Sequence, residues 1–377
     1  MLILMSCILV LALVITGYFV VNGFRKKKKE QGFAKSMISM GFGLIPTSFG
    51  GDWGDKLFAL ASGFILKTPS SEVLQQIDQT SQLNLAQLVV GIVLLGLGIF
   101  FDIHVRRKYY ILNIDMIGRR IDNYENSAGL SHFDYKEYVI DIKRECQGVM
   151  TSETAKDIHQ IIEENMKAFR ERTAQLKRGY TGVSPIPFVM LAGTYFSREY
   201  VNEYYEFNKH NEVYVSLTAE KKHFPKLKRR TNLDNLDHNA TEVVLAISLT
   251  KQIDSVDTEQ FQLPIVHLSV DKPGDNVITS KVQLREYRQT VYDTIMEIQN
   301  KLLHVTKMHL LYSGQSCLAF EMGKFFNELD SNRISEVISY QYSRQLQPRY
   351  HWSLNINGQQ KGLFTDLRIQ TGGEVNI

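Results

Sequence analysis

Residues 309–342 of the 377-residue chain read HLLYSGQSCLAFEMGKFFNELDSNRISEVISYQY. The apolar run that ends at Tyr312 predicts a buried strand, and Ser313–Ser316 predict a turn of small residues after it. Apolar side chains then recur at helical spacing, which predicts an amphipathic helix over Ser316–Leu329. Val337–Tyr342 predict another strand. The succession of strand, helix and strand is typical of an α/β domain with a largely parallel sheet.

The same texture extends over residues 179–377, where short apolar runs alternate with helical stretches. Further strands are predicted at Ile186–Leu191, Glu212–Leu217, Val243–Leu249, Ile265–Val270 and His351–Ile356, and further helices at Ser197–Phe207 and Val282–Leu303. We therefore expect one α/β domain over this part of the chain.

Two segments repeat one pattern, in which an apolar run leads through small residues into a helix. In the first, Pro187–Leu191 precede Ala192, Gly193 and Thr194, and in the second the run ends before Ser313–Ser316. The carboxyl ends of parallel strands and the free N–H groups of helix N-termini favour anionic ligands. Neither turn has the GxGxxG or GxxxxGK[ST] pattern, so neither is a standard nucleotide-binding loop.

The first 104 residues predict a membrane region. Residues 2–21 and 83–101 are apolar runs long enough to span a bilayer, and basic residues follow both, at 25–29 and 106–108. The first run lacks the charge order of a cleaved signal, so we expect an uncleaved anchor. Both basic ends face the cytoplasm by the positive-inside rule, which requires a crossing between them, for which the Gly-rich segment 33–49 is the candidate.

Residues 105–178 predict a mostly helical connector, because Ser152–Lys177 carry apolar residues at helical spacing without Gly or Pro. Residues 105–377 contain 35 Lys and Arg against 34 Asp and Glu, a net charge of +1. This balance disfavours binding to long nucleic acid. Three distant cysteines (Cys7, Cys146 and Cys317) fit a reducing compartment and predict neither a disulfide framework nor a zinc site.

On these residues the sequence resembles the SAVED-domain family. The segment from Met308 to Tyr342 is similar to the closing half of that domain, including the Tyr340-Gln341-Tyr342 strand end, and Glu242–Thr250 with the helix Leu284–Leu303 fit the same layout. The resemblance covers about residues 180–370. It implies two fused CARF-like, Rossmann-type subdomains, which agrees with the repeated pattern.

The resemblance also implies a function. SAVED proteins are receptors in bacterial cyclic-oligonucleotide-based antiphage signalling (CBASS), in which a partner nucleotidyltransferase makes a cyclic di- or trinucleotide. The implied protein is a non-enzymatic, multi-pass effector of the bacterial inner membrane with a cytoplasmic sensor domain. Ligand binding would drive assembly of a homo-oligomer that disrupts the lipid bilayer. No cofactor, metal or catalytic residue is implied.

The resemblance assigns ligand contacts to the two turns and to the ends of neighbouring strands. Tyr342 is the candidate for base stacking. The full set is Ser313, Gly314, Gln315, Ser316, Tyr342, Thr250, Lys251, Gly193 and Thr194.

Two alternatives remain: a membrane-tethered hydrolase and a structural adaptor. The hydrolase lacks a GxSxG or HExxH motif, and its histidines are scattered along the sequence. Asp234–His238 form the densest polar cluster, and Arg229 with Arg230 are a conceivable phosphate clamp, but solvated loops are the simpler interpretation of both. The adaptor predicts no affinity for small molecules.

Overall fold

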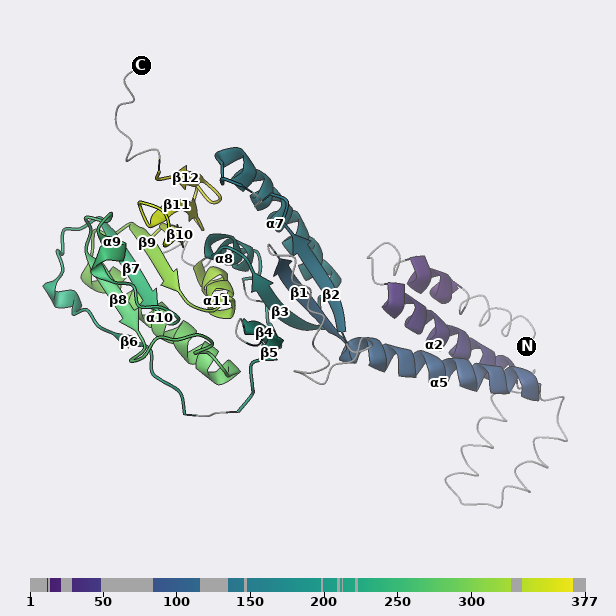
Figure 1. The fold of residues 1–377 in the computed structure, drawn as a ribbon. Helices are drawn as coiled ribbons and strands as arrows, with labels where there is room; N and C mark the ends of the chain where they lie inside the picture. Colours follow the sequence, from purple (N-terminus) through teal and green to yellow (C-terminus); the bar gives the residue numbers. More distant parts are fainter. Residues whose placement is uncertain are drawn as a thin grey trace. The chain divides into compact units, whose positions relative to one another are not determined.

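The structure is a computed structural model in two compact units, Met1–Lys108 and Tyr109–Ile377. It describes residues 12, 14–21, 29–48, 84–115, 135–145, 148–197, 199–208, 211, 213–220, 223–326 and 334–368. Figure 1 shows the course of the chain through these elements.

The first unit contains two long helices, α2 (Lys29–Ser48) and α5 (Leu85–Arg107). Among the described residues, Leu85–Arg106 form the one helix long and apolar enough to cross a membrane, with a mean hydropathy of 2.4. Many apolar side chains of α5 are exposed, including Val89, Ile92 and Phe100. Exposed apolar surface of this kind marks a contact with a membrane or with another protein.

The expected spans fall on the described residues unequally. Helix α5 contains all but the first two residues of the span 83–101, and α2 contains all but the last residue of the span 33–49. Of the span 2–21, residues 12 and 14–21 are described and are helical, while the rest lies outside the described residues.

Glycines set the distance between α2 and α5. A Cβ added at Gly41 would lie 2.6 Å from the backbone nitrogen of Leu95, and one at Gly98 would lie 2.8 Å from that of Ile38. Larger side chains at either glycine would push the helices apart. Small residues with this effect are common where membrane helices pack against each other.

The second unit begins with a five-stranded sheet (Figure 1). Its order is β2 (Tyr135–Asp141), β1 (Tyr109–Asp115), β3 (Lys177–Val183), β4 (Glu203–Asn208) and β5 (Val213–Ser216). All neighbours are parallel except β4 and β5, which are antiparallel. Helix α7 (Ser152–Arg172) packs on β2 with a buried stripe that includes Ile158, Ile162 and Phe169.

A seven-stranded sheet forms the rest of the unit. Its order is β12 (Phe364–Asp366), β11 (Tyr350–Asn355), β10 (Glu336–Tyr342), β9 (Lys307–Ser313), β7 (Glu242–Ser248), β8 (Ile265–Ser269) and β6 (Lys228–Arg229). The four central strands from β10 to β8 are parallel, and the outer strands are antiparallel. The helices are η2 (Leu233–Asn235), α9 (Ser255–Thr258) and α10 (Lys281–Lys301), which packs beside α11 (Ser316–Phe326).

Two helices lie between the sheets, and each packs on the sheet that it does not follow (Figure 1). Helix α8 (Ile186–Thr194) follows β3 but packs on β10 and β11, where Phe188 meets Trp352. Helix α11 follows β9 but packs on β3 and β4, where the ring of Phe320 stacks on Tyr180 at a centroid distance of 4.2 Å. This exchange joins the two sheets into one core.

One strand–turn–helix unit occurs in each half of the second unit, and the two occurrences, here called copies, are offset by 130 positions. β3 starts at Lys177 and β9 at Lys307, the strands end at 183 and 313, and the helices start at 186 and 316. The offset also relates Gly193 to Gly323, which lie where the helices cross. A Cβ on Gly193 would overlap the carbonyl oxygen of Phe320, and one on Gly323 that of Met190. The copies therefore touch through their backbones.

Two elements differ in type from the sequence prediction. Ile186–Leu191, expected as a strand, belong to α8, because the strand of this copy ends earlier, at Val183. A short apolar run buried on all sides has no periodicity that separates strand from helix. Ser197–Phe207, expected as a helix, instead include most of β4, where Tyr204 and Tyr205 are buried. Aromatic residues favour strands over helices.

The connector prediction for residues 105–178 is also wrong in part. Its helix is present as α7, but β1, β2 and the start of β3 lie in the same segment. Both β1 and β2 mix aromatic and β-branched residues with charges, so neither forms an apolar run of the kind used to find strands. The first sheet therefore begins at Tyr109, well before residue 179.

We expect Gly323→Ala to destabilise the second unit by about 1–3 kcal/mol, because the new methyl group must displace the backbone of α8. Urea unfolding of the detergent-purified full chain, followed by tryptophan fluorescence, measures the change. Gly274→Ala is the matched control, since a Cβ there meets no atom within 4 Å. Equal stability of the two variants would contradict the close crossing of α8 and α11.

Candidate ligand-binding site

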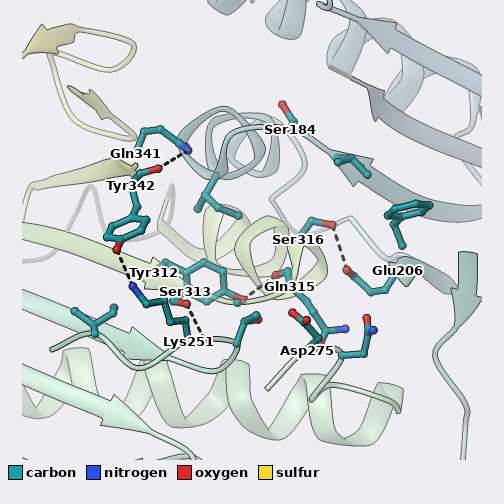
Figure 2. Close-up of a pocket in the computed structure, with 18 of the residues that line it drawn as sticks. Ser184, Glu206, Lys251, Asp275, Tyr312, Ser313, Gln315, Ser316, Gln341 and Tyr342 are labelled. Carbon is teal, nitrogen blue, oxygen red and sulfur yellow. Dashed lines mark hydrogen bonds between the residues drawn. The ribbon is translucent and has the colours of Figure 1, made fainter. Parts of the chain in front are cut away.

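A cavity of about 370 Å³ opens where the carboxyl ends of β3 and β9 meet (Figure 2). The first half contributes Gly182, Val183, Ser184, Ile186, Glu206 and Phe207. The second half contributes Thr250, Lys251, Gln252, Ile253, Asp257, Asp275, Asn276, Tyr312, Ser313, Gly314, Gln315, Ser316, Gln341, Tyr342 and Tyr350. The two equivalent strand–turn–helix units thus face one shared space.

Lys251 and Tyr342 are joined by a polar network at one side of the cavity. The Lys251 ammonium donates to the Tyr342 hydroxyl at 2.7 Å and lies 4.6 Å from the centre of its ring. The Tyr342 hydroxyl donates to Asp257, which also accepts from Arg349. Burial acts to raise the pKa of Asp257, but the hydrogen bond from Arg349 and the charge of Lys251 outweigh it and lower that pKa. The network holds a cation and an aromatic ring at the cavity wall.

The loop after β7 is fixed by two serines. The Ser313 hydroxyl accepts from the backbone N–H of Lys251 at 2.9 Å. The Ser248 hydroxyl accepts from the backbone N–H of Ile253 at 2.9 Å and lies 2.8 Å from Nε2 of His267. Thr250 and Lys251, both predicted ligand contacts, are therefore held in place beside the turn Ser313–Ser316.

The N-terminus of α11 is occupied by a carboxylate of the protein itself. Glu206 accepts from the backbone N–H of Cys317 at 2.6 Å. It also accepts from the Ser316 hydroxyl at 3.2 Å (Figure 2). Burial raises the pKa of Glu206, while the hydrogen bonds from Cys317 and Ser316 act in the opposite direction. The helix end that the sequence suggests for an anionic ligand already carries an internal anion.

Gln315 has a structural role. Its side-chain carbonyl accepts from the backbone N–H of Ile278 at 2.5 Å, and its amide donates to the carbonyl oxygen of the same residue at 3.0 Å. Asn276, two residues before Ile278, also lines the cavity and has a φ of 53°. Gln315 therefore fixes the loop that carries Asp275 and Asn276.

Seven of the nine predicted ligand residues line this cavity: Ser313, Gly314, Gln315, Ser316, Tyr342, Thr250 and Lys251. The other two do not. Gly193 lies at the crossing of α8 and α11, and the hydroxyl of Thr194 donates to the carbonyl oxygen of Leu191 inside α8. Their expected position, a turn after a strand, was wrong because the true turn of this copy is at Ser184 and Pro185.

Sequence reasoning missed the first-half wall, namely Gly182–Ser184 with Glu206 and Phe207. The signal was present in the 130-residue offset, by which Val183 and Ser184 are the equivalents of Ser313 and Gly314 in the sequence. Glu206 and Phe207 carried no such signal, since their segment was expected to be helical. The acidic residues Asp257 and Asp275 were also missed, because only pairing in space brings them to the cavity.

The polar clusters outside the cavity form ion pairs. Arg229 pairs with Glu297 and Arg230 with Asp271. Asp234 pairs with Lys301 at 2.6 Å. Within the described part of the chain, no group of three His, Cys, Asp or Glu side chains is placed to hold a metal ion.

The chain belongs to the SAVED family, the "SMODS-associated and fused to various effectors sensor domain", whose sequence profile matches residues 162–356. The prediction of a SAVED protein is thereby confirmed, and so is its coarse fold, an α/β sensor domain. No curated protein sequence matches the chain.

Among solved structures, the chain is similar to the Cap4 SAVED/CARF-domain containing receptors. The Acinetobacter baumannii receptor with the cyclic trinucleotide 2′3′3′-cAAA is 14% identical over 81% of this chain and 66% of that chain, with a TM-score of 0.43. The same receptor with 3′3′3′-cAAA has a TM-score of 0.45 at 14% identity, covering 81% and 67%. The Moraxella osloensis receptor has a TM-score of 0.42 at 14% identity, covering 81% and 65%. The chain thus spans about two thirds of the length of these receptors.

We expect the stability of the chain to fall as the pH drops below about 6.5, in part through His267. Burial and the nearby charge of Arg230 lower the pKa of His267 from its ordinary value of 6.5. The unfolded chain therefore binds the proton first, and the folded state loses stability as the pH falls through 6.5 towards the folded pKa.

Thermal unfolding at pH 7.5 and 5.5 measures this effect. His267→Gln is expected to lose less stability over the interval than the unmodified chain, while the exposed His223→Gln keeps the full loss. An unchanged pH dependence in His267→Gln would contradict the assignment. The half-buried His159 and the buried His309 and His351 act in the same direction and maintain part of the slope.

Proposed function

We propose that the chain is a receptor for a cyclic di- or trinucleotide, which binds in the cavity between the two halves of the SAVED domain. The observation that carries this proposal is the convergence of two equivalent strand–turn–helix units on one cavity with a cation and aromatic walls. Solved Cap4 receptors that contain cyclic trinucleotides support the choice of ligand class.

The cavity has the groups that such a ligand needs. Lys251 supplies a positive charge for a phosphate, and the hydroxyl of Ser313 with the backbone of Gly314, both in the cavity lining, supplies neutral contacts. Tyr342, which packs edge-on against Tyr350, offers a ring face for a base. A ligand with two or three phosphates requires only a few donors, which agrees with the near-neutral charge of residues 105–377.

We further propose that the first unit anchors the receptor in the bacterial inner membrane as a multi-pass segment, with the sensor domain in the cytoplasm. The length and exposed apolar surface of α5 support this, as do the basic residues at 25–29 and 106–108. Ligand binding then favours an assembled homo-oligomer, and assembly brings the spans together and disrupts the membrane during antiphage defence. The ligand can do this only through its differential affinity for the two states.

Calorimetric titration of the detergent-purified full chain with a panel of cyclic di- and trinucleotides tests the ligand. At least one member is expected to bind, and Tyr342→Ala to weaken it about tenfold or more, the loss expected for one stacked base at roughly 1–3 kcal/mol. Lys251→Ala is expected to weaken binding as well, whereas the exposed Lys156→Ala on α7 keeps full affinity.

Failure of every member of the panel to bind a well-folded chain would contradict the receptor. The adaptor would then lead if the chain bound no small molecule at all, and the tethered hydrolase if the chain turned over a substrate.

Dye release from vesicles of bacterial lipids that contain the chain tests the membrane step. Release is expected only after the bound nucleotide is added, and Gly98→Leu should reduce it because the new side chain separates α2 from α5. Gly96→Leu is the control, since a Cβ there meets no atom within 4 Å. Ligand binding without dye release would contradict membrane disruption while leaving the receptor intact.

A further inference from the structure

The equivalence of the two strand–turn–helix units extends to the next strand of each sheet, where the offset is 135 positions instead of 130. In the first sheet Gly179 of β3 pairs with Glu203 of β4. In the second sheet His309, the counterpart of Gly179, pairs with Ile338 of β10. Three positions further along each strand, Glu206 corresponds to Gln341. The next position matches Phe207 with Tyr342.

Both matched aromatic residues are supported in the same way. Phe207 lies opposite Tyr214 on the following antiparallel strand, with ring centroids 5.2 Å apart. Tyr342 lies opposite Tyr350 on its following antiparallel strand, with ring centroids 5.4 Å apart. Phe207 and Tyr342 are both partly exposed and both line the cavity. The cavity thus has two equivalent aromatic walls.

We infer that Phe207 and Glu206 form a second base-binding subsite, in which Phe207 stacks on a base and Glu206 selects one that carries an exocyclic amine. This inference rests on the proposed receptor function and specifies which rings the receptor accepts. Glu206 is the specificity-determining residue of the pair, because its counterpart Gln341 is neutral and both donates and accepts.

The position of Glu206 excludes a phosphate from this end of the cavity. Its side chain already satisfies Ser316 and the N-terminal N–H of Cys317, and a phosphate placed there would meet a second negative charge. Asp275 adds another acidic group to the lining. Figure 2 shows Glu206 with Ser316 on one side of the view and Lys251 with Tyr342 on the other. Phosphates therefore belong near Lys251, and a base near Glu206.

The chemistry of a carboxylate then restricts the base. A carboxylate accepts hydrogen bonds and donates none, so it favours a base edge with an amine, as in adenine, cytosine or guanine. The edge of uracil has one N3–H donor between two carbonyl oxygens, and these oxygens repel a carboxylate. Oε1 of Glu206 accepts from the Ser316 hydroxyl and from the Cys317 N–H. A carboxylate has about four lone-pair sites on its two oxygens, so Glu206 keeps acceptor capacity for the amine.

A titration that varies ligand and protein together tests the subsite. The probes are the cyclic tri-AMP, tri-CMP, tri-GMP and tri-UMP rings. A further probe is the analogue of cyclic tri-AMP in which purine replaces adenine, so that the exocyclic amine is missing. The protein variants are Glu206→Ala and Glu206→Gln, with Glu171→Ala on the exposed face of α7 as the matched control. Thermal unfolding of each variant establishes that it is folded.

We expect amine-bearing rings to bind and cyclic tri-UMP to bind at least tenfold more weakly. Glu206→Ala should weaken cyclic tri-AMP about 10- to 100-fold, the range for a hydrogen bond to a charged group, and leave the purine analogue almost unchanged. Glu206→Gln, which keeps one carbonyl acceptor, should lose less than Glu206→Ala. It also serves as the test if the alanine variant does not fold.

Three results would overturn the inference while the receptor function stands. The first is preferred binding of cyclic tri-UMP. The second is equal loss of cyclic tri-AMP and its purine analogue in Glu206→Ala. The third is tighter binding of every ring by that variant, which would make Glu206 a competitor of the ligand phosphate. If neither these rings nor any other cyclic di- or trinucleotide bound to the folded chain, both the receptor function and the inference would be overturned.

Discussion

The backbone contact between Gly193 and Gly323 is the constraint on which the sensor domain depends. Each glycine lets the backbone of one helix reach a carbonyl oxygen of the other, so α8 and α11 cross without intervening side chains. Because each helix packs on the opposite sheet, this close crossing draws the two sheets together. The aromatic contacts of Phe188 with Trp352 and of Tyr180 with Phe320 then fill the space on either side.

The cavity is a consequence of this exchange of helices. Since β3 and β9 point their carboxyl ends into the same region, the two turns that open α8 and α11 meet there. The duplication gives the cavity two similar walls, but the side chains on them differ. One wall has Lys251 beside Tyr342, and the other has Glu206 beside Phe207. Two similar strand–turn–helix units thus carry different charges at the cavity.

Some elements were predictable because their signals are local. The strand and helix around Ser313–Ser316 are as expected, since the apolar run, the small-residue turn and the amphipathic stripe all agree. The helix Val282–Leu303 is present as α10 for the same reason. Ile186–Leu191 failed, because a helix buried on every side has no polar face to reveal its period. β1 and β2 were missed because they lack a continuous apolar run.

The sequence by itself determined the family, the α/β class and seven cavity residues, four in the second turn and three at the ends of neighbouring strands, because these depend on short-range patterns of residues. The 130-residue repeat is also present in the sequence, but the apolar run Ile186–Leu191 obscured where the repeat starts in the first copy. Tertiary structure alone decided which residues share the cavity and what each does there. Gly193 became a packing residue and Glu206 a cavity carboxylate at the end of α11, because both roles arise from contacts between segments more than 100 positions apart.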